Sequence, residues 1–202
     1  MKRLIMYSGG FDSLCLLVTL LAEQKEGDEV QLLYFDYEQR NLHQELTCVT
    51  HMAKRFDLAL TIIPLPEFVH VDNVCLDGHG SSIKGSHYIP MRNVIFFSHA
   101  LSIAQAEGIE EIYFGFIAPP EDGGYCDADA NFIKWCNDFS KKQGIKVKAP
   151  FIKLNKADIK EFFDATDFTQ ESFFSCNTPI EKDGKIVPCG ECGDCKLINS
   201  LF

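Results

Sequence analysis

The sequence has few features that would place the chain in a membrane or on nucleic acid. It has no run of about 18 apolar residues, so no membrane-spanning helix is predicted. The apolar stretch near the N-terminus is too short for a secretory signal peptide. Lys and Arg total 19 against 29 Asp and Glu, giving a formal net charge of −10. Broad binding to nucleic acid needs an excess of basic residues, so nucleic acid is not an expected partner.

Tryptophan is scarce, whereas cysteine is plentiful. One Trp stands against 17 Phe, so we expect a core rich in phenylalanine. Nine Cys would indicate disulfides in a small secreted protein. Here the count is odd and the chain is larger, which favours a reducing, cytoplasmic environment. A chain of 202 residues with 46% hydrophobic content can form one domain with a small appendage.

Segments typical of strands and helices alternate along most of the chain. Strands are predicted at 3–7, 30–35, 58–63, 111–116 and 147–151, and helices at 12–24, 42–56, 93–107, 130–142 and 156–165. This alternation predicts an α/β, Rossmann-like fold with an open, mainly parallel sheet and helices on both faces. Residues 74–88 lack periodicity and are predicted to be a long loop. We expect a first domain at 1–170 and a small zinc-binding C-terminal unit at 171–202.

A glycine-rich segment connects the first predicted strand to the first helix. Residues 8–13 read Ser-Gly-Gly-Phe-Asp-Ser. Two glycines allow the backbone to approach a ligand closely, and the start of a helix favours an anion. No Lys precedes Ser13, so this is not a Walker-type loop. The alternative is a plain turn in which Asp12 or Ser13 caps the helix.

This segment resembles the Ser-Gly-Gly-x-Asp-Ser signature of the PP-loop ATP pyrophosphatases. The resemblance implies an adenine nucleotide alpha hydrolase-like fold, with a loop that holds the pyrophosphate portion of ATP. It also implies Mg²⁺ bound with ATP, where Asp12 orders the loop and Ser13 donates to a phosphate. Such enzymes activate an oxygen atom as an adenylate and release AMP and pyrophosphate.

The C-terminal region carries cysteines at metal-ligand spacing. Cys189, Cys192 and Cys195 are separated by two residues each, and Cys176 lies thirteen positions upstream of the first. Four thiolates around one zinc ion make a closed, structural site. Cysteines without a metal and a redox or sulfur-carrying pair are the alternatives. Asp183 and Gly184 predict a turn, and with it a hairpin between the two parts of the site.

Further motifs follow the glycine loop in a characteristic order. They are Phe-Asp-Tyr-Glu-Gln-Arg at 35–40, Pro-Met-Arg-Asn at 90–93, Gly115 with Asp-Gly-Gly-Tyr at 122–125, Leu-Asn-Lys-Ala-Asp at 154–158, and the four cysteines. This order resembles the 7-cyano-7-deazaguanine synthase family over nearly the whole chain. Glu38 stands where the family usually has Gly, and Met91 where it has a small residue. The segment 118–127 carries one extra residue after Gly115, so it fits the family least well.

The resemblance implies an ATP-dependent carbon–nitrogen ligase. ATP adenylylates the carboxylate of 7-carboxy-7-deazaguanine, ammonia gives the amide, and a second ATP converts the amide to the nitrile preQ0. The expected catalytic residues are Asp12, Ser13, Arg92 and Lys156. The expected ATP-binding residues are Ser8, Gly9, Gly10, Phe11, Asp12, Ser13, Phe35, Arg40, Arg92, Asn93 and Gly115. The expected substrate-binding residues are Tyr37, Gln39, Asp122, Tyr125 and Asp127, whose rings can stack and whose polar groups can pair with a purine edge.

Three other functions are open at this point. A divergent family member could pass the activated deazaguanine to a protein amine, as relatives in antiviral operons are thought to do. A PP-loop transferase acting on tRNA would need a basic face and a reactive Cys pair. A non-catalytic nucleotide-binding module would use its zinc knuckle as a partner surface. The oligomeric state, with a homodimer as one option, is not predicted by these residues.

Overall fold

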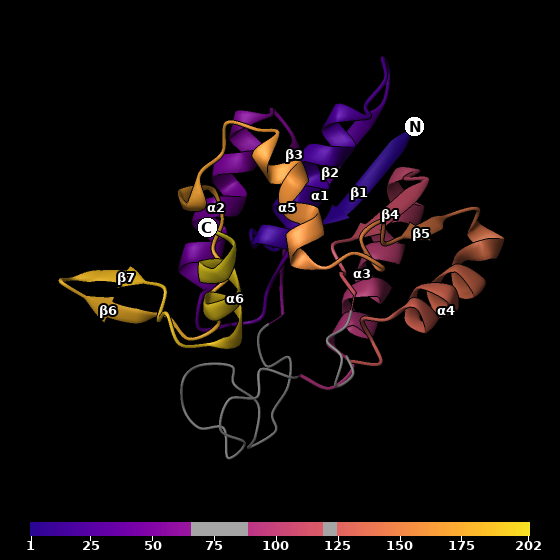
Figure 1. Ribbon diagram of the computed structural model, residues 1–202. Coiled ribbons are helices and arrows are strands. Elements are labelled where there is room, and N and C mark those ends of the chain that lie inside the picture. Colours follow the sequence, from indigo (N-terminus) through magenta and orange to yellow (C-terminus); the bar gives the residue numbers. More distant parts are fainter. Residues whose placement is uncertain (66–88, 119–124) are drawn as a thin grey trace.

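A computed structural model describes residues 1–65, 89–118 and 125–202 (Figure 1). Its elements, in chain order, are β1 (Lys2–Met6), α1 (Phe11–Ala22), β2 (Glu29–Asp36), α2 (Leu42–Arg55), β3 (Ala59–Pro64), α3 (Arg92–Glu107), β4 (Glu111–Phe114), α4 (Ala130–Ser140), β5 (Lys146–Lys148), α5 (Lys156–Asp164), β6 (Ile180–Lys182), β7 (Lys185–Val187) and α6 (Gly193–Leu201). Short 3₁₀ turns at Lys141–Gln143 and Gln170–Ser172 complete them. The loop predicted at 74–88 lies outside the described residues. Helix α6 was not predicted, because its sequence is dominated by cysteine, glycine and polar residues.

The main sheet confirms the predicted α/β class. Its five strands are parallel and run in the order β3-β2-β1-β4-β5. The chain first builds outward from β1 through β2 to β3, and then returns to place β4 and β5 on the other side. The order therefore reverses at β1. In open α/β sheets, the crevice at the carboxyl end of such a strand is where ligands bind.

The two faces of the sheet are buried under different helices. Along β1 and β2, neighbouring side chains alternate between the faces, so Ile5 and Leu32 enter one core while Leu4 and Leu33 enter the other. The first core is closed by α1, α2, α5 and α6, and the second by α3 and α4 (Figure 1). Both faces are thus covered, as predicted for a parallel sheet.

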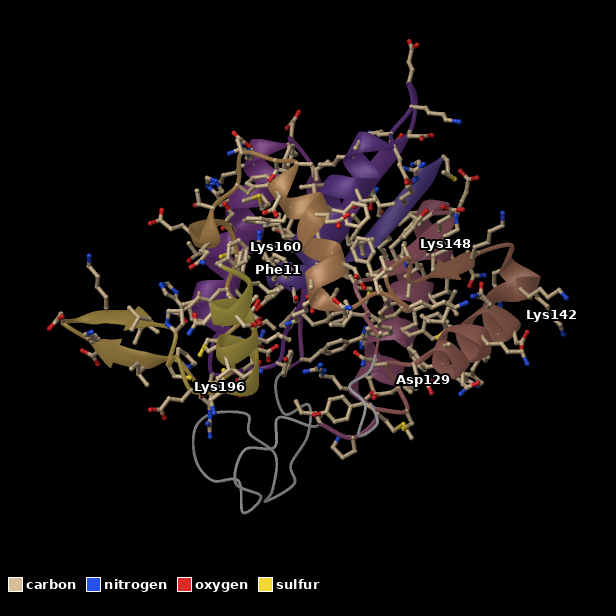
Figure 2. The ribbon with its side chains drawn as sticks, in the orientation of Figure 1. Phe11, Asp129, Lys142, Lys148, Lys160 and Lys196 are labelled. Carbon is tan, nitrogen blue, oxygen red and sulfur yellow. The ribbon has the colours of Figure 1, made fainter. Side chains whose placement is uncertain are left out.

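Phenylalanine fills much of the first core, as its abundance predicted. Phe11 at the start of α1, labelled in Figure 2, is fully buried. Its ring centroid lies 5.5 Å from that of Phe163, 5.1 Å from that of Phe173 and 5.9 Å from that of Phe202. Edge-to-face contacts with Phe173 and Phe202 join Phe11, within the glycine loop, to the end of the chain.

A separate antiparallel hairpin, β6–β7, extends away from the sheet (Figure 1). Asp183 and Gly184 form its turn with φ of 53° and 72°. Two left-handed residues in succession are typical of a type I′ hairpin, so the turn predicted from Asp-Gly is confirmed. Among the helices that the structure describes, none is long and apolar enough to cross a bilayer.

Gly9 provides a test of how tightly the glycine loop packs. It has φ of +76°, and a Cβ there would lie 3.0 Å from the Glu45 carbonyl oxygen. Gly144 has a similar φ of +73°, but no atom of the described residues lies within 4 Å of such a Cβ. Gly144→Ala should therefore lower the free energy of unfolding by about 1 kcal/mol, the cost of the left-handed conformation alone. Gly9→Ala should cost about 1–3 kcal/mol more, because a backbone atom must move. Urea denaturation of both variants measures the difference, and equal losses would contradict the packing.

Candidate functional site

The glycine loop lies at the carboxyl end of β1, where the strand order reverses. Helix α1 begins at Phe11, and its N-cap is Gly10, with no capping side chain. The proposal that Asp12 or Ser13 caps this helix is therefore wrong: the helix begins earlier, and both residues lie in its first turn. The Ser13 hydroxyl donates to the Gly10 carbonyl at 3.0 Å and lies 3.3 Å from Ser8 Oγ. Both hydroxyls therefore sit at the N-terminus of α1, where an anion is favoured.

Asp12 lies beside a buried lysine. Lys156 occupies the first position of α5, whose start is fixed by a capping box between Asn155 and Asp158. Its Nζ is 3.6 Å from Asp12 Oδ2 and 2.9 Å from Asp194 Oδ1. Asp12 Oδ1 is buried and has no hydrogen-bond partner among the described residues. Burial raises the pKa of the Asp12 carboxyl to about 6, although the charge of Lys156 opposes the shift.

A small polar pocket of about 40 Å³ lies next to the loop, beyond the end of β2. It is lined by Tyr37, Gln39, Arg40, Asn41, Glu45, Ile89, Arg92 and Asn177. Arg92 donates to the Tyr37 hydroxyl at 3.1 Å, and its guanidinium lies 5.7 Å from the centres of the Tyr37 and Phe96 rings. The Nε atoms of Arg40 and Arg92 are buried without a partner in the described part of the chain. Two guanidinium groups with unused donors suit a phosphate or carboxylate.

Glu45 of α2 is a member of this pocket that no sequence motif indicated. Its carboxylate accepts hydrogen bonds from Tyr34 Oη at 2.9 Å, Gln39 Nε2 at 2.8 Å and Asn41 Nδ2 at 2.9 Å. Burial raises the pKa of Glu45 to about 7, although these donors and Arg92 oppose the shift. The group therefore titrates near neutral pH beside the two arginines.

Gln39 is occupied by the protein itself. It is buried, its Nε2 donates to Tyr34, Phe35 and Glu45, and its Oε1 accepts from the Tyr37 N–H at 3.0 Å. Its place in the structure is to hold the turn after β2. A direct hydrogen bond to a substrate, as predicted, would require one of these contacts to be exchanged.

Two residues of the predicted site meet at the start of α3. The backbone N–H of Asn93 donates to Asp127 Oδ2 at 3.0 Å, and Asp127 is buried. Asp127 thus caps α3 from a distant part of the chain. Tyr125 is 53% exposed, and Asp122 lies outside the described residues.

Gly115 and Phe35 shape the ATP side of the predicted site. A Cβ at Gly115 would lie 3.3 Å from the backbone of Ser13, so the residue after β4 packs directly on α1. The Phe35 ring stacks on Phe96 at 4.1 Å and belongs to the second core.

The four C-terminal cysteines converge in space. The sulfur atoms of Cys176, Cys189, Cys192 and Cys195 all lie within 4.8 Å of one another. Backbone N–H groups of Cys192 and Glu191 donate to Cys189 Sγ at 3.3 and 3.4 Å. Burial acts against ionisation of Cys189, but Thr178 and these N–H groups outweigh it and lower the thiol pKa. Such a cluster can hold a metal ion, and its four thiol donors match a tetrahedral site.

The cysteine region packs directly on the glycine loop. The Phe174 N–H donates to the Gly9 carbonyl at 2.9 Å, and the Phe11 N–H donates to Ser175 Oγ at 3.0 Å. Asn41 Nδ2 donates to the Cys176 carbonyl at 3.1 Å. The C-terminal segment therefore forms one wall of the site, whereas the boundary at residue 170 stays a prediction.

A parallel sheet with a glycine loop at its switch point defines the Rossmann-like α/β class of protein. Similar chains include the U34-tRNA thiolase NcsA from Methanococcus maripaludis, with a TM-score of 0.55 and 12% identity over 85% of this chain and 59% of that one. A predicted subunit of a tRNA methyltransferase from Methanocaldococcus jannaschii has a TM-score of 0.51 and 14% identity over 81% and 74% of the two chains. At these identities the likeness shows the shared fold.

The particular family follows from sequence comparison. The family model described as Queuosine biosynthesis protein QueC matches residues 2–202. A 7-cyano-7-deazaguanine synthase of Campylobacter jejuni subsp. doylei is 33% identical over 97% of this chain and 91% of its own length. One from Nostoc punctiforme is 33% identical over 100% and 95%. The chain belongs to the QueC family, which confirms the resemblance drawn from its motifs.

Metal analysis tests the cysteine cluster. We expect one metal ion per chain, and Cys192→Ser should lose it and lower the melting temperature, because a three-thiolate site holds metal less well. Cys126→Ser is the matched control, since Cys126 is exposed and outside the cluster. A metal-free preparation with an unchanged melting temperature would rule out a structural metal here.

Proposed function

We propose that this chain is an ATP-dependent 7-cyano-7-deazaguanine synthase. The observation that carries this proposal is the QueC match over residues 2–202, with the glycine loop at the switch point of the sheet. In the proposed reaction, the carboxylate oxygen of 7-carboxy-7-deazaguanine attacks ATP and pyrophosphate leaves. Ammonia then displaces AMP to give the amide. The amide oxygen then attacks a second ATP and pyrophosphate leaves, and loss of AMP and of both amide protons gives the nitrile.

The phosphates of ATP would occupy the N-terminus of α1. Ser8 and Ser13 would donate hydroxyls there, and the backbone of Gly9 and Gly10 would allow close approach. Arg40 and Arg92 support this placement, because each has a buried Nε without a partner in the described residues. Their charges would offset the charge that develops as pyrophosphate leaves.

Two cations are proposed with different tasks. Mg²⁺ would accompany ATP, and Asp12 Oδ1 is a suitable ligand because it is a buried carboxylate oxygen with no partner in the described part of the chain. Zinc would fill the four-cysteine cluster, where four thiolates leave no open coordination position. The zinc would therefore stabilise the C-terminal segment and would not contact the substrate.

The deazaguanine would bind between the end of β2 and the segment after β4. Tyr37 is held by Arg92 at the pocket wall, and Tyr125 has an exposed ring that can stack on a flat heterocycle. Asp127 would stabilise this surface by capping α3. Asp122 remains a proposed hydrogen-bond acceptor for the substrate. We propose ammonia as the acceptor. No observation above favours a protein amine, a tRNA transferase or a non-catalytic module.

Product analysis tests the reaction. Incubation with ATP, 7-carboxy-7-deazaguanine and ammonia should give AMP, pyrophosphate and the nitrile, measured by mass spectrometry. Arg92→Gln should lower kcat/KM by about 100-fold or more, because a charged donor to the leaving phosphates is lost. Lys142→Gln, an exposed lysine on the 3₁₀ turn after α4, is the charge-matched control. Release of ADP and phosphate would overturn the proposed class.

The pH dependence of nucleotide binding tests Asp12. Its raised pKa of about 6 means that the carboxyl is protonated below that pH and charged above it. Only the charged form can hold Mg²⁺, so the affinity for Mg²⁺-ATP should rise as the pH increases from about 5 to about 7. Asp12→Asn should bind more weakly at neutral pH and lose this rise. Calorimetry across the pH range measures both effects, and an identical pH profile for the variant would remove Asp12 from the metal's ligands.

A further inference from the structure

One carboxylate joins the cysteine cluster to the nucleotide loop. Asp194 lies between Cys192 and Cys195, in the first turn of α6. One of its oxygens accepts from Lys156 Nζ at 2.9 Å, and the other accepts from Asn177 Nδ2 at 2.6 Å. Lys156 Nζ in turn lies 3.6 Å from Asp12 Oδ2. A line of polar contacts therefore runs from Asp194, which precedes Cys195 in sequence, through Lys156 to Asp12.

The placement of Lys156 depends on this contact. A lysine ammonium is a point charge on a flexible stem, so its position is set by its partners. The Lys156 side chain is only 7% exposed, and in the described residues its two ion-pair partners are Asp12 and Asp194. Asp194 is the nearer of the two and makes the hydrogen bond within normal distance.

The placement of Asp194 depends in turn on the cysteines. Its neighbour Cys195 is buried, and the Cys195 N–H donates to Cys192 Sγ at 3.4 Å. Asn177, the second partner of Asp194, directly follows Cys176 in sequence. It also lines the small polar pocket that contains Arg40 and Arg92. Asp194 is thus next to Cys195 of the cluster in sequence, and its second hydrogen-bond partner, Asn177, is next to Cys176. We therefore expect that opening the cluster would displace this carboxylate.

We propose that Asp194 is a positioning residue that couples metal binding in the four-cysteine cluster to nucleotide binding through Lys156. The inference rests on the proposed function, because it places ATP at the loop that Lys156 adjoins. Coupling between two sites is reciprocal. A metal in the cluster fixes Asp194 and hence Lys156, and bound nucleotide fixes Lys156 and hence the cluster.

The test measures zinc release. Zinc-loaded protein is mixed with a chelating dye, with and without a saturating non-hydrolysable ATP analogue in excess Mg²⁺. Nucleotide should slow zinc release from the wild type about tenfold, which corresponds to a coupling of about 5- to 150-fold in affinity that acts mainly on the dissociation rate. Asp194→Asn should reduce this protection to below about twofold, since it removes the charge that holds Lys156. Glu191→Gln is the matched control, because Glu191 is an exposed acid between Cys189 and Cys192. Any chelation of released zinc by the nucleotide itself is the same for this variant, and the variant should keep the protection.

Each outcome decides between coupling and a purely structural role. Calorimetry first establishes that the wild type binds the analogue, and absence of binding would overturn the proposed function and this inference together. If the wild type binds it but releases zinc at an unchanged rate, the inference alone is overturned. Full protection in Asp194→Asn would show that nucleotide acts by another route. If the Asp194→Asn protein purifies without zinc, Asp194 is a structural part of the four-cysteine cluster and the inference is overturned. Asp194→Ser is the second variant if the first aggregates.

Discussion

Close packing around the glycine loop leaves little room for a side chain at two of its contacts and fixes how the surrounding elements meet. A side chain at Gly9 would meet the backbone of α2, and one at Gly115 would meet the backbone of α1. The Gly9 carbonyl also accepts a hydrogen bond from Phe174, in the segment leading to the cysteines. Three parts of the chain that are far apart in sequence therefore converge on one turn at the end of β1.

This convergence makes the C-terminal segment part of the site. Phe173 and Phe202 pack on Phe11, the first residue of α1. The Phe11 backbone N–H donates a hydrogen bond to Ser175 Oγ. The glycine loop thus packs both on the phenylalanine core and on the segment that carries Cys176. A metal that stabilises the four cysteines would stabilise this wall as well, without any contact to the nucleotide.

The predicted site has charged side chains with buried polar atoms that the described residues leave unpaired. Arg40 and Arg92 each keep a buried Nε, and Asp12 keeps a buried oxygen, without a partner in the described residues. Arg3 Nε and Tyr7 Oη are also unpartnered there. Buried polar atoms are usually satisfied, so the three open atoms of the predicted site are consistent with a polar ligand that completes it. The raised pKa values of Asp12 and Glu45 have the same origin, because burial there is not fully offset by neighbours.

Much of the fold could be predicted from local patterns. Apolar residues at strand and helix periods predicted each strand of the main sheet, because a parallel sheet buries both of its faces. The Asp183-Gly184 turn and the start of α5 were readable because the residues that form them are adjacent in sequence. The same holds for three of the four cysteines. Helix α6 and the N-cap of α1 were not predicted correctly, since propensity does not show where a chain entering a packed loop first becomes helical.

The order of elements, the motifs and the family could be recognised without a structure, because they depend on residue type and spacing along the chain. Which polar side chains already have partners within the protein became visible in the folded structure alone. Gln39 and Asp127 match the family motifs, yet one is bound within the turn after β2 and the other caps α3. The contact between Lys156 and Asp194 spans 38 residues. Partners of this kind are set by how the helices pack on the sheet, and no local pattern encodes that distance.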